Sequence, residues 1–242
     1  MPRKKKPETA NLPAVVTPVR SLVRSMNGSS AMVKVDAVYH VPDVHPKEKG
    51  PWEGEADKIA WTDEMTGYAC IIRRTALSEG QHLCGYVAVP PRHPLFGRRH
   101  GTLVGIGIGV HGGLDYSAAC QYRAPEERSI CHVPIESAFA VINDEIVHSI
   151  NADRHDHDDA WWFGFSCNQL DDVIPAGTRI SDGSRRWLRR GVDDRTYKTE
   201  GYVYEECVRL AIQLKAIEEG RDPETADPGP TRMTSFPEGD RG

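Results

Sequence analysis

Apolar residues recur at steps of three and four along residues 198–219, which is the spacing of one helical face. The apolar positions are Val203, Cys207, Leu210, Leu214 and Ile217. Charged residues such as Glu206 and Arg209 occupy other faces, and Gly220 is a typical C-terminal stop. The pattern predicts a long amphipathic helix whose apolar stripe covers one face of a sheet.

Shorter apolar or alternating runs are typical of β-strands. These runs are residues 32–39, 59–61, 68–72, 82–89 and 161–165. The second and third flank a polar turn that ends at Gly67, which predicts a β-hairpin. Pro90 and Pro91 end the fourth run because proline donates no hydrogen bond to a strand ladder.

Residues 103–110 alternate glycine with branched apolar residues. Their spacing differs from that of a dinucleotide-binding loop, so we expect a further strand. The glycines would leave one face of this strand bare, where a ring, a ligand or another backbone can approach.

Together these elements predict an α+β fold in which a long C-terminal helix packs on one face of an antiparallel, twisted sheet. We expect three regions. Residues 1–50 form a partly disordered N-terminal extension, residues 51–220 a single globular domain, and residues 221–242 a disordered tail. Within the domain, residues 118–160 have the pattern of an insertion, in which residues 139–147 fit either a strand or a short helix.

Composition and charge narrow the function classes. The chain is 39% hydrophobic and 27% charged, and it contains no apolar run of the ~20 residues that would span a bilayer. The basic residues at the N-terminus precede no apolar signal core, so we expect a cytoplasmic protein without membrane contact. A net charge of −5 disfavours bulk nucleic-acid binding. The arginines of residues 185–190 are a local exception, either a clamp for an anion or a solvated surface.

The six cysteines are Cys70, Cys84, Cys120, Cys131, Cys167 and Cys207. An even number permits disulfides, but several lie in apolar runs, no two are separated by just two residues, and no export signal is evident. We therefore expect reduced, mostly buried thiols.

Two strand-like runs lead directly into clusters of polar residues and glycine. In the first, His111 precedes Gly112 and Gly113, with Asp115 close behind. Two glycines expose main-chain N–H groups that can bind an anion, while the histidine serves as base, donor or metal ligand. The alternative is a histidine that only fixes the turn by bonding a neighbouring carbonyl.

The second cluster follows the aromatic strand at residues 161–165. Gln169, Asp171 and Asp172 can bind a hard cation or orient His111, or they are ordinary loop residues that begin a turn. A His/Asp run at residues 153–159 superficially resembles a metal site, although such runs are usually solvated loops. The chain contains no nucleophilic serine elbow, phosphate-binding Gly-Lys-Ser/Thr loop or His-Glu-x-x-His helix.

Several motifs together resemble a family of uncharacterised bacteriophage and prophage proteins. The motifs are the His-Gly-Gly-Leu-Asp-Tyr-Ser segment at 111–117, Trp52, residues 85–87, Pro90–Pro91, His93–Pro94 and the strand at 161–165. The resemblance covers roughly residues 51–214 and implies a phage accessory role without a defined activity. The family's aromatic strand continues as Phe-Asp-Cys-x-His-x-Gly-Asp, whereas this chain has Ser166 and Gln169 at the Asp and His positions and matches at Asp172. Serine and glutamine are poor metal or acid–base groups, which favours binding over catalysis.

The resulting hypothesis is a phage-type accessory protein that binds a small phosphorylated, nucleotide-like ligand in a pocket at the strand ends, to counter host defence. The candidate ligand-binding residues are His111, Gly112, Gly113, Asp115, Gln169, Asp172 and Arg186.

Two other functions stay open. One is a metal-assisted hydrolase of a phosphorylated small molecule, in which His111 and Asp172 hold a divalent ion or activate water. The other is a protein–protein inhibitor that uses Trp52, Trp61 and Trp187 as anchors. A host protein partner and a homo-oligomer are compatible with any of the three.

Overall fold

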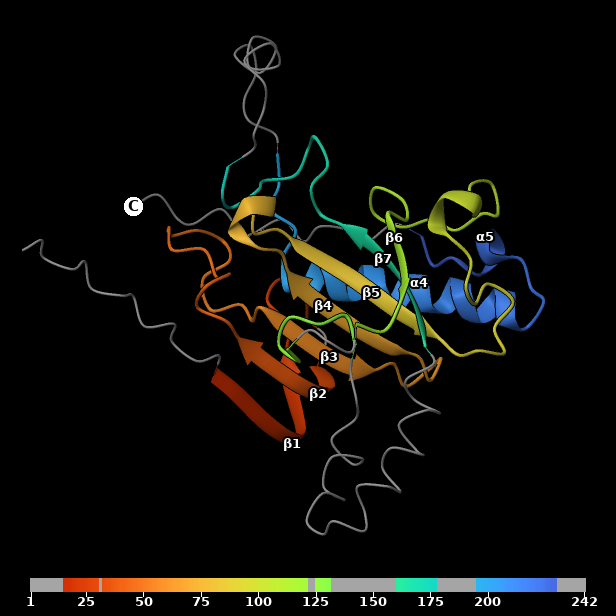
Figure 1. The fold of residues 1–242 in the computed structure, drawn as a ribbon, viewed down its shortest axis with the longest axis horizontal. Helices are drawn as coiled ribbons and strands as arrows, with labels where there is room; N and C mark the ends of the chain where they lie inside the picture. Colours follow the sequence, from red (N-terminus) through yellow and green to blue (C-terminus); the bar gives the residue numbers. More distant parts are fainter. Residues whose placement is uncertain (1–14, 31, 122–124, 132–159, 178–194, 230–242) are drawn as a thin grey trace, which may run out of the picture.

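The computed structural model describes residues 15–30, 32–121, 125–131, 160–177 and 195–229. In this part of the chain, seven strands form one sheet in the order β1-β2-β3-β4-β5-β7-β6 (Figure 1). All neighbouring strands are antiparallel. The strands are β1 (Val15–Ser25), β2 (Met32–His40), β3 (Lys58–Thr62), β4 (Ala69–Arg74), β5 (Leu83–Val89), β6 (Tyr116–Ala119) and β7 (Trp161–Ser166).

The predicted β-hairpin is confirmed as β3 and β4, in which Ile59 pairs with Ile72. Asp63 closes its turn by accepting a hydrogen bond of 2.9 Å from the Thr66 N–H. Gly67 follows with φ +72°, a conformation that glycine adopts without strain. The strands predicted at residues 82–89 and 161–165 are confirmed as β5 and β7.

The predicted C-terminal helix is α4 (Glu200–Glu218), and Thr199 caps it by accepting a hydrogen bond from the Tyr202 N–H. Helix α4 crosses one face of the sheet, over β4 and β5 (Figure 1). Its apolar stripe is fully buried at Val203, Cys207, Leu210 and Leu214. This arrangement confirms the predicted α+β fold. Two one-turn 3₁₀ helices, Leu77–Glu79 and His100–Thr102, and the short α5 (Pro223–Ala226) complete the described elements.

The opposite face of the sheet carries a second hydrophobic cluster. It consists mainly of small and aromatic side chains, among them Ala60, Tyr86 and Trp162. Ile130, which lies outside the strands, packs against this cluster and is 1% exposed. A segment after β6 therefore covers part of this face.

A buried ionic network joins the chain before β3 to the chain before α4. Arg74, whose side chain is fully buried, donates hydrogen bonds to Glu55 (2.9 Å), Asp57 (3.0 Å) and the Tyr197 hydroxyl (3.0 Å). Burial raises the pKa of Glu55, although hydrogen bonds from Tyr197 and Arg74 oppose that effect. Glu55 also accepts the backbone N–H of Glu200, so the network fixes the start of α4.

The expected boundaries at both ends of the globular domain differ from the observed ones. Strands β1 and β2 precede residue 51 and extend the sheet, because β2 pairs with β3 through Val38 and Ile59. At the other end, α5 lies beside α4, where Asp227 accepts a hydrogen bond of 2.6 Å from the Arg209 Nε. Residues 132–159, including the segment expected to be strand or short helix, lie outside the described residues.

The strand predicted at residues 103–110 is wrong: this segment is a loop that runs beside α4 and α5. Gly105 and Gly107 have φ of +88° and +84°, which interrupt an extended backbone. Gln213 of α4 then satisfies the polar backbone of the segment, since its side chain accepts the Gly109 N–H and donates to the Gly109 carbonyl, both at 2.7 Å. A helix side chain thus replaces the partner strand.

The expectation of reduced thiols is wrong for one pair and correct for the other four cysteines. Cys120 and Cys131 form a disulfide, with their Cα atoms 5.0 Å apart. The other four cysteines are free and buried.

Candidate functional site

The structure brings His111 and Asp172 together, as the sequence suggested. The His111 Nε2 lies 2.8 Å from the Asp172 Oδ2, and its Nδ1 lies 3.1 Å from the Tyr202 hydroxyl. The backbone N–H of His111 donates to Glu206 at 2.7 Å. Both ring nitrogens therefore have partners, so the imidazole is held between the end of β7 and the start of α4.

Asp172 is buried and surrounded by donors. Its Oδ2 also accepts the Gln169 N–H at 2.8 Å, and its Oδ1 lies 3.4 Å from the Lys198 ammonium. Burial raises the pKa of Asp172, but the hydrogen bonds from His111 and Gln169 and the positive charges nearby outweigh it and lower the pKa below its usual value. The carboxylate stays ionised and anchors the loop after β7.

Replacing Asp172 by asparagine is expected to lower the free energy of unfolding by about 1–3 kcal/mol at pH 7, because buried donors lose a charged acceptor. A depressed carboxyl pKa stabilises the fold above the unfolded value of about 4, and this stability is lost as the pH falls through the folded value. The variant should therefore show a weaker loss of stability below pH 4 than the wild type. Urea unfolding at pH 7 and at pH 3 measures both effects. Equal pH dependence in the two proteins would contradict them.

The paired glycines form no open row of N–H donors. The His111 N–H is bound to Glu206, and the Gly113 N–H donates to the Val110 carbonyl at 2.9 Å. Gly112 lies against the Gln169 side chain, where a Cβ would overlap the amide. The anion site expected at these amides is therefore not formed by the His111 and Gly113 N–H groups.

The remaining predicted site residues lie apart from His111 or outside the described residues. The Asp115 N–H pairs with the Gly164 carbonyl of β7, and its carboxylate hydrogen-bonds Ser166. Arg186 lies in a segment that the structure does not describe. Of the proposed tryptophan anchors, Trp52 and Trp61 are buried, at 7% and 1% exposure, and Trp187 is not described. The expectation that Trp52 and Trp61 act as surface anchors is therefore wrong.

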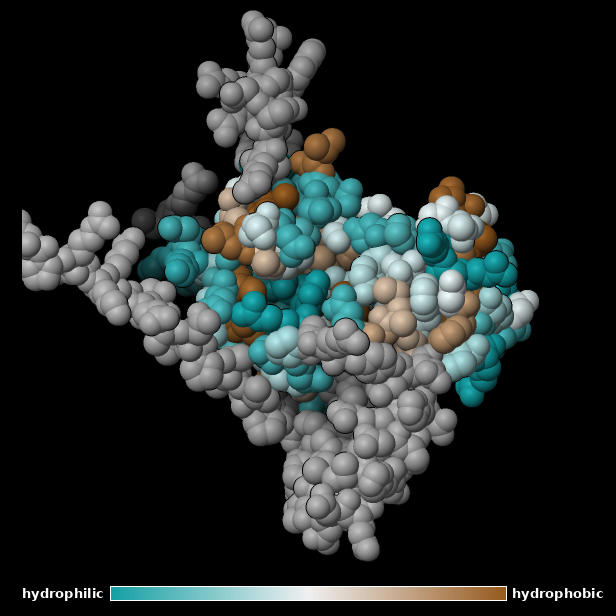
Figure 2. Space-filling view, in the orientation of Figure 1, coloured by the Kyte–Doolittle hydropathy of each residue, from teal (hydrophilic) through white to brown (hydrophobic). Residues whose placement is uncertain are grey.

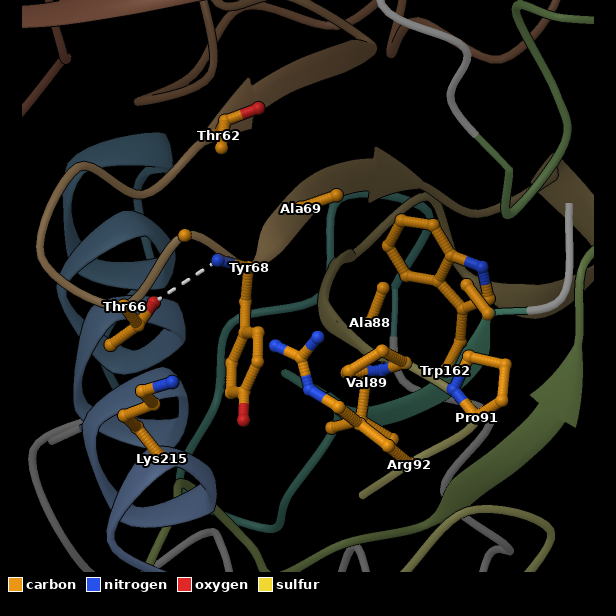
Figure 3. Close-up of a pocket in the computed structure, with 13 residues that line it drawn as sticks. Thr62, Thr66, Tyr68, Ala69, Ala88, Val89, Pro91, Arg92, Trp162 and Lys215 are labelled. Atoms are coloured by element: carbon orange, nitrogen blue, oxygen red, sulfur yellow. Dashed lines mark hydrogen bonds between the residues drawn. The ribbon is translucent and has the colours of Figure 1, made fainter. Parts of the chain in front are cut away.

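A cleft of about 390 Å³ lies at the other end of the sheet, beside the C-terminal half of α4. Its walls come from the ends of β3, β4, β5 and β7 and from α4. The lining residues labelled in Figure 3 are Thr62, Thr66, Tyr68, Ala69, Ala88, Val89, Pro91, Arg92, Trp162 and Lys215. Tyr202 and Lys215 are separated by about 20 Å along α4, at about 1.5 Å per residue, so this cleft is distinct from the His111 network.

The charged groups of the cleft are arranged around Glu218. Its carboxylate accepts hydrogen bonds from the Arg92 Nε (3.0 Å), the Tyr68 hydroxyl (2.9 Å) and the Lys215 ammonium (2.5 Å). Partial burial raises the pKa of Glu218, but the three donors outweigh it and lower the pKa to about 2. With two cations and one carboxylate, the cleft carries a net positive charge.

Arg92 presents unused donors to this cleft. Glu218 holds its Nε, whereas its two terminal nitrogens make no hydrogen bond within the described part of the chain. Its guanidinium lies beside the Tyr68 ring, and both groups bind Glu218 (Figure 3). The small side chains Ala69 and Ala88 leave room beside it. Geometrically, the cleft fits an acidic group next to a flat or apolar one.

Sequence reasoning missed this cleft. Pro90 and Pro91 could have indicated the position of Arg92, because a strand that ends in two prolines turns the next residue away from the sheet. No sequence pattern indicated Lys215, since it resembles an ordinary surface charge on a helix.

Among the residues that the structure describes, no group of three His, Cys, Asp or Glu side chains is placed to hold a metal ion, and His155 and His157 lie outside them. No described helix is both long and apolar enough to cross a membrane. On the face in Figure 2, exposed hydrophobic residues form separate spots among polar ones.

No family model, curated protein or solved structure matches the chain.

Proposed function

We propose that the protein binds a small anionic ligand, of the phosphorylated, nucleotide-like class, in the cleft between Tyr68, Arg92, Trp162 and Lys215. The observation that carries the proposal is the Arg92 guanidinium: Glu218 orients it, and neither terminal nitrogen is hydrogen-bonded to the described residues. Two parallel N–H donors match the geometry of a phosphate or carboxylate. The proposal keeps the ligand class expected from the sequence and moves the site from His111 to the opposite end of α4.

The shape of the cleft supports a ligand with a flat apolar part. A volume of about 390 Å³ lies in the range of small-molecule sites, roughly 300–1,000 Å³. Pro91, which is exposed, offers apolar surface on one side, and the cations lie on the other (Figure 3). A base or similar ring would pack on the apolar side, with its phosphate on Arg92.

Binding without conversion is favoured over hydrolysis. A hydrolase that uses His111 as its base or metal ligand needs a ring nitrogen of His111 that is free to act on water or a metal. Tyr202 and Asp172 occupy both ring nitrogens, and the pair lies far from the cleft. The resemblance to phage accessory proteins supports a role in sequestering a nucleotide signal of host defence in the cytoplasm.

The Arg92→Gln variant is expected to bind the ligand at least about tenfold more weakly, because a charge-assisted hydrogen bond contributes about 1.5–3 kcal/mol. The measurement is calorimetric titration of the full chain with AMP, ADP and cyclic AMP, with uncharged adenosine as a reference ligand. Arg99→Gln is the matched control, since Arg99 is also an exposed arginine but does not line the cleft.

The control should bind as the wild type does, and adenosine should bind more weakly than the phosphorylated ligands. Mass analysis should recover the ligand intact. Equal affinity of Arg92→Gln and wild type, or no binding of any nucleotide, would overturn the proposal. Conversion of a bound nucleotide to product would replace binding by the hydrolase alternative.

A further inference from the structure

Lys58 of β3 is fully buried, which is rare for a lysine. Its side chain lies on the sheet face opposite α4, with the ammonium 5.3 Å from the centre of the Tyr39 ring. Burial lowers the pKa of Lys58 to about 8, while the nearby Glu126 opposes that effect. A substantial fraction of this amine is therefore uncharged, and nucleophilic, at mildly alkaline pH.

The acceptors of the Lys58 ammonium come from residues 125–131, which we call the cover segment. The ammonium donates to the backbone carbonyls of Glu126 and Cys131, the latter at 3.0 Å, and lies 3.5 Å from the Ser129 hydroxyl. The side chain of Lys58 is 0% exposed beneath this segment. Access to the amine thus requires the cover segment to move.

A disulfide fixes the end of the cover segment. Cys131 is its last residue and is bonded to Cys120, which follows β6 directly. Weaker contacts hold the rest of the segment, including a hydrogen bond of 2.8 Å from Arg73 to the Arg128 carbonyl and the packing of Ile130. Among the described residues, breaking the disulfide leaves non-covalent contacts to hold the segment over Lys58, including the ion pair of Arg128 with Asp43 at 3.0 Å.

We propose that Lys58 is a redox-controlled modification site, shielded while the Cys120–Cys131 disulfide is intact and open to acylation once it is reduced. A dithiol reductant transfers two electrons and two protons to the sulfur pair, the S–S bond breaks, and the reductant leaves as a disulfide. The uncharged Lys58 amine then attacks the carbonyl of an activated acyl donor. A C–N bond forms, the bond to the leaving group breaks, and the nitrogen releases one proton to solvent.

The other four cysteines take no part in the reduction step. Cys70, Cys84, Cys167 and Cys207 are free and buried, and burial raises the pKa of each thiol. These groups are already reduced, so a dithiol reductant leaves them unchanged. Thiolates are the reactive form, so the four thiols also react slowly with disulfides. Reduction therefore acts on the cover segment alone.

The test is acetylation of the full chain with trace acetic anhydride at pH 8, mapped by peptide mass spectrometry. The oxidised protein is compared with protein reduced by dithiothreitol, and thiol alkylation verifies each state. The rate at Lys58 should rise at least about tenfold on reduction, because removing a cross-link that closes a short loop favours open conformations. The exposed Lys34 normalises the reagent dose, and the buried Lys198 reports on global unfolding.

A Cys120→Ser/Cys131→Ser variant separates the disulfide from other effects of the reductant. It should label at Lys58 as fast as the reduced wild type and should not respond to dithiothreitol. An unchanged Lys58 rate on reduction would overturn the proposal. A parallel rise at Lys198 would also overturn it, because it would show unfolding of the whole protein instead of local opening.

Discussion

Replacing Arg74 by methionine is expected to lower the free energy of unfolding by about 3–5 kcal/mol. The guanidinium is fully buried and bonds two buried carboxylates, Glu55 and Asp57. Methionine fills a similar volume but leaves both acids without their cation in a region that water does not reach. The loss of stability is large because two buried carboxylates keep their negative charge after the guanidinium is removed. The loss of the hydrogen bonds alone would cost less.

Urea unfolding at pH 7 measures this loss, with Arg221→Met as the matched control. Arg221 is 58% exposed at its side chain and pairs with Glu219 on the surface, so its replacement should cost less than about 1 kcal/mol. Arg74→Lys should fall between the two variants, because lysine keeps the charge but not the planar set of donors. A loss below about 1 kcal/mol for Arg74→Met would show that the network does not fix the start of α4.

The second large effect is expected for Phe165→Ala, at about 3–5 kcal/mol of unfolding free energy. Phe165 is 0% exposed and lies between the sheet and α4. Its ring packs so closely on β5 that a Cβ at Gly85 would lie 2.6 Å from its Cε1. Truncation removes this packing and leaves a cavity beneath Cys207, which the rigid sheet cannot close.

The same denaturation assay tests this effect against Phe96→Ala. Phe96 is half-buried and contacts Trp161 outside the main core, so its truncation should cost clearly less. Phe165→Leu should recover much of the stability, since leucine refills most of the cavity. Similar losses for Phe165→Ala and Phe96→Ala would contradict the placement of Phe165 in the core between sheet and helix.

The elements that the sequence predicted correctly are those with a regular spacing of hydrophobic residues. The stripe from Val203 to Leu214 and the hairpin around Gly67 are both confirmed, because burial of one face determines local structure there. The prediction of a strand at residues 103–110 was wrong because alternation of glycine with apolar residues resembles the pattern of a strand. Gly105 adopts a positive φ, and the pairing of Gly109 with Gln213 depends on α4, which lies far away in sequence.

For the candidate sites too, the sequence predicted some features and missed others. A link between Asp172 and His111 was predicted, because each was expected to follow a strand of one sheet. The structure keeps the link although only Asp172 follows a strand, β7, and His111 follows a loop. The cleft around Arg92 was missed because its wall residues come from five separate elements without a shared motif. The Cys120–Cys131 bond was missed for a similar reason, since sequence spacing does not report whether two Cα atoms lie within bonding reach.

The most direct test of ligand binding in the cleft is a titration of isotopically labelled protein with ADP, followed by nuclear magnetic resonance. The side-chain N–H signals of tryptophan and arginine report on individual sites. We expect the Arg92 Nε–H and Trp162 indole signals to shift and saturate together, while the ring signals of His111 stay unchanged. Shifts confined to His111 and its neighbours, or no shifts at any site, would contradict a ligand site in the cleft.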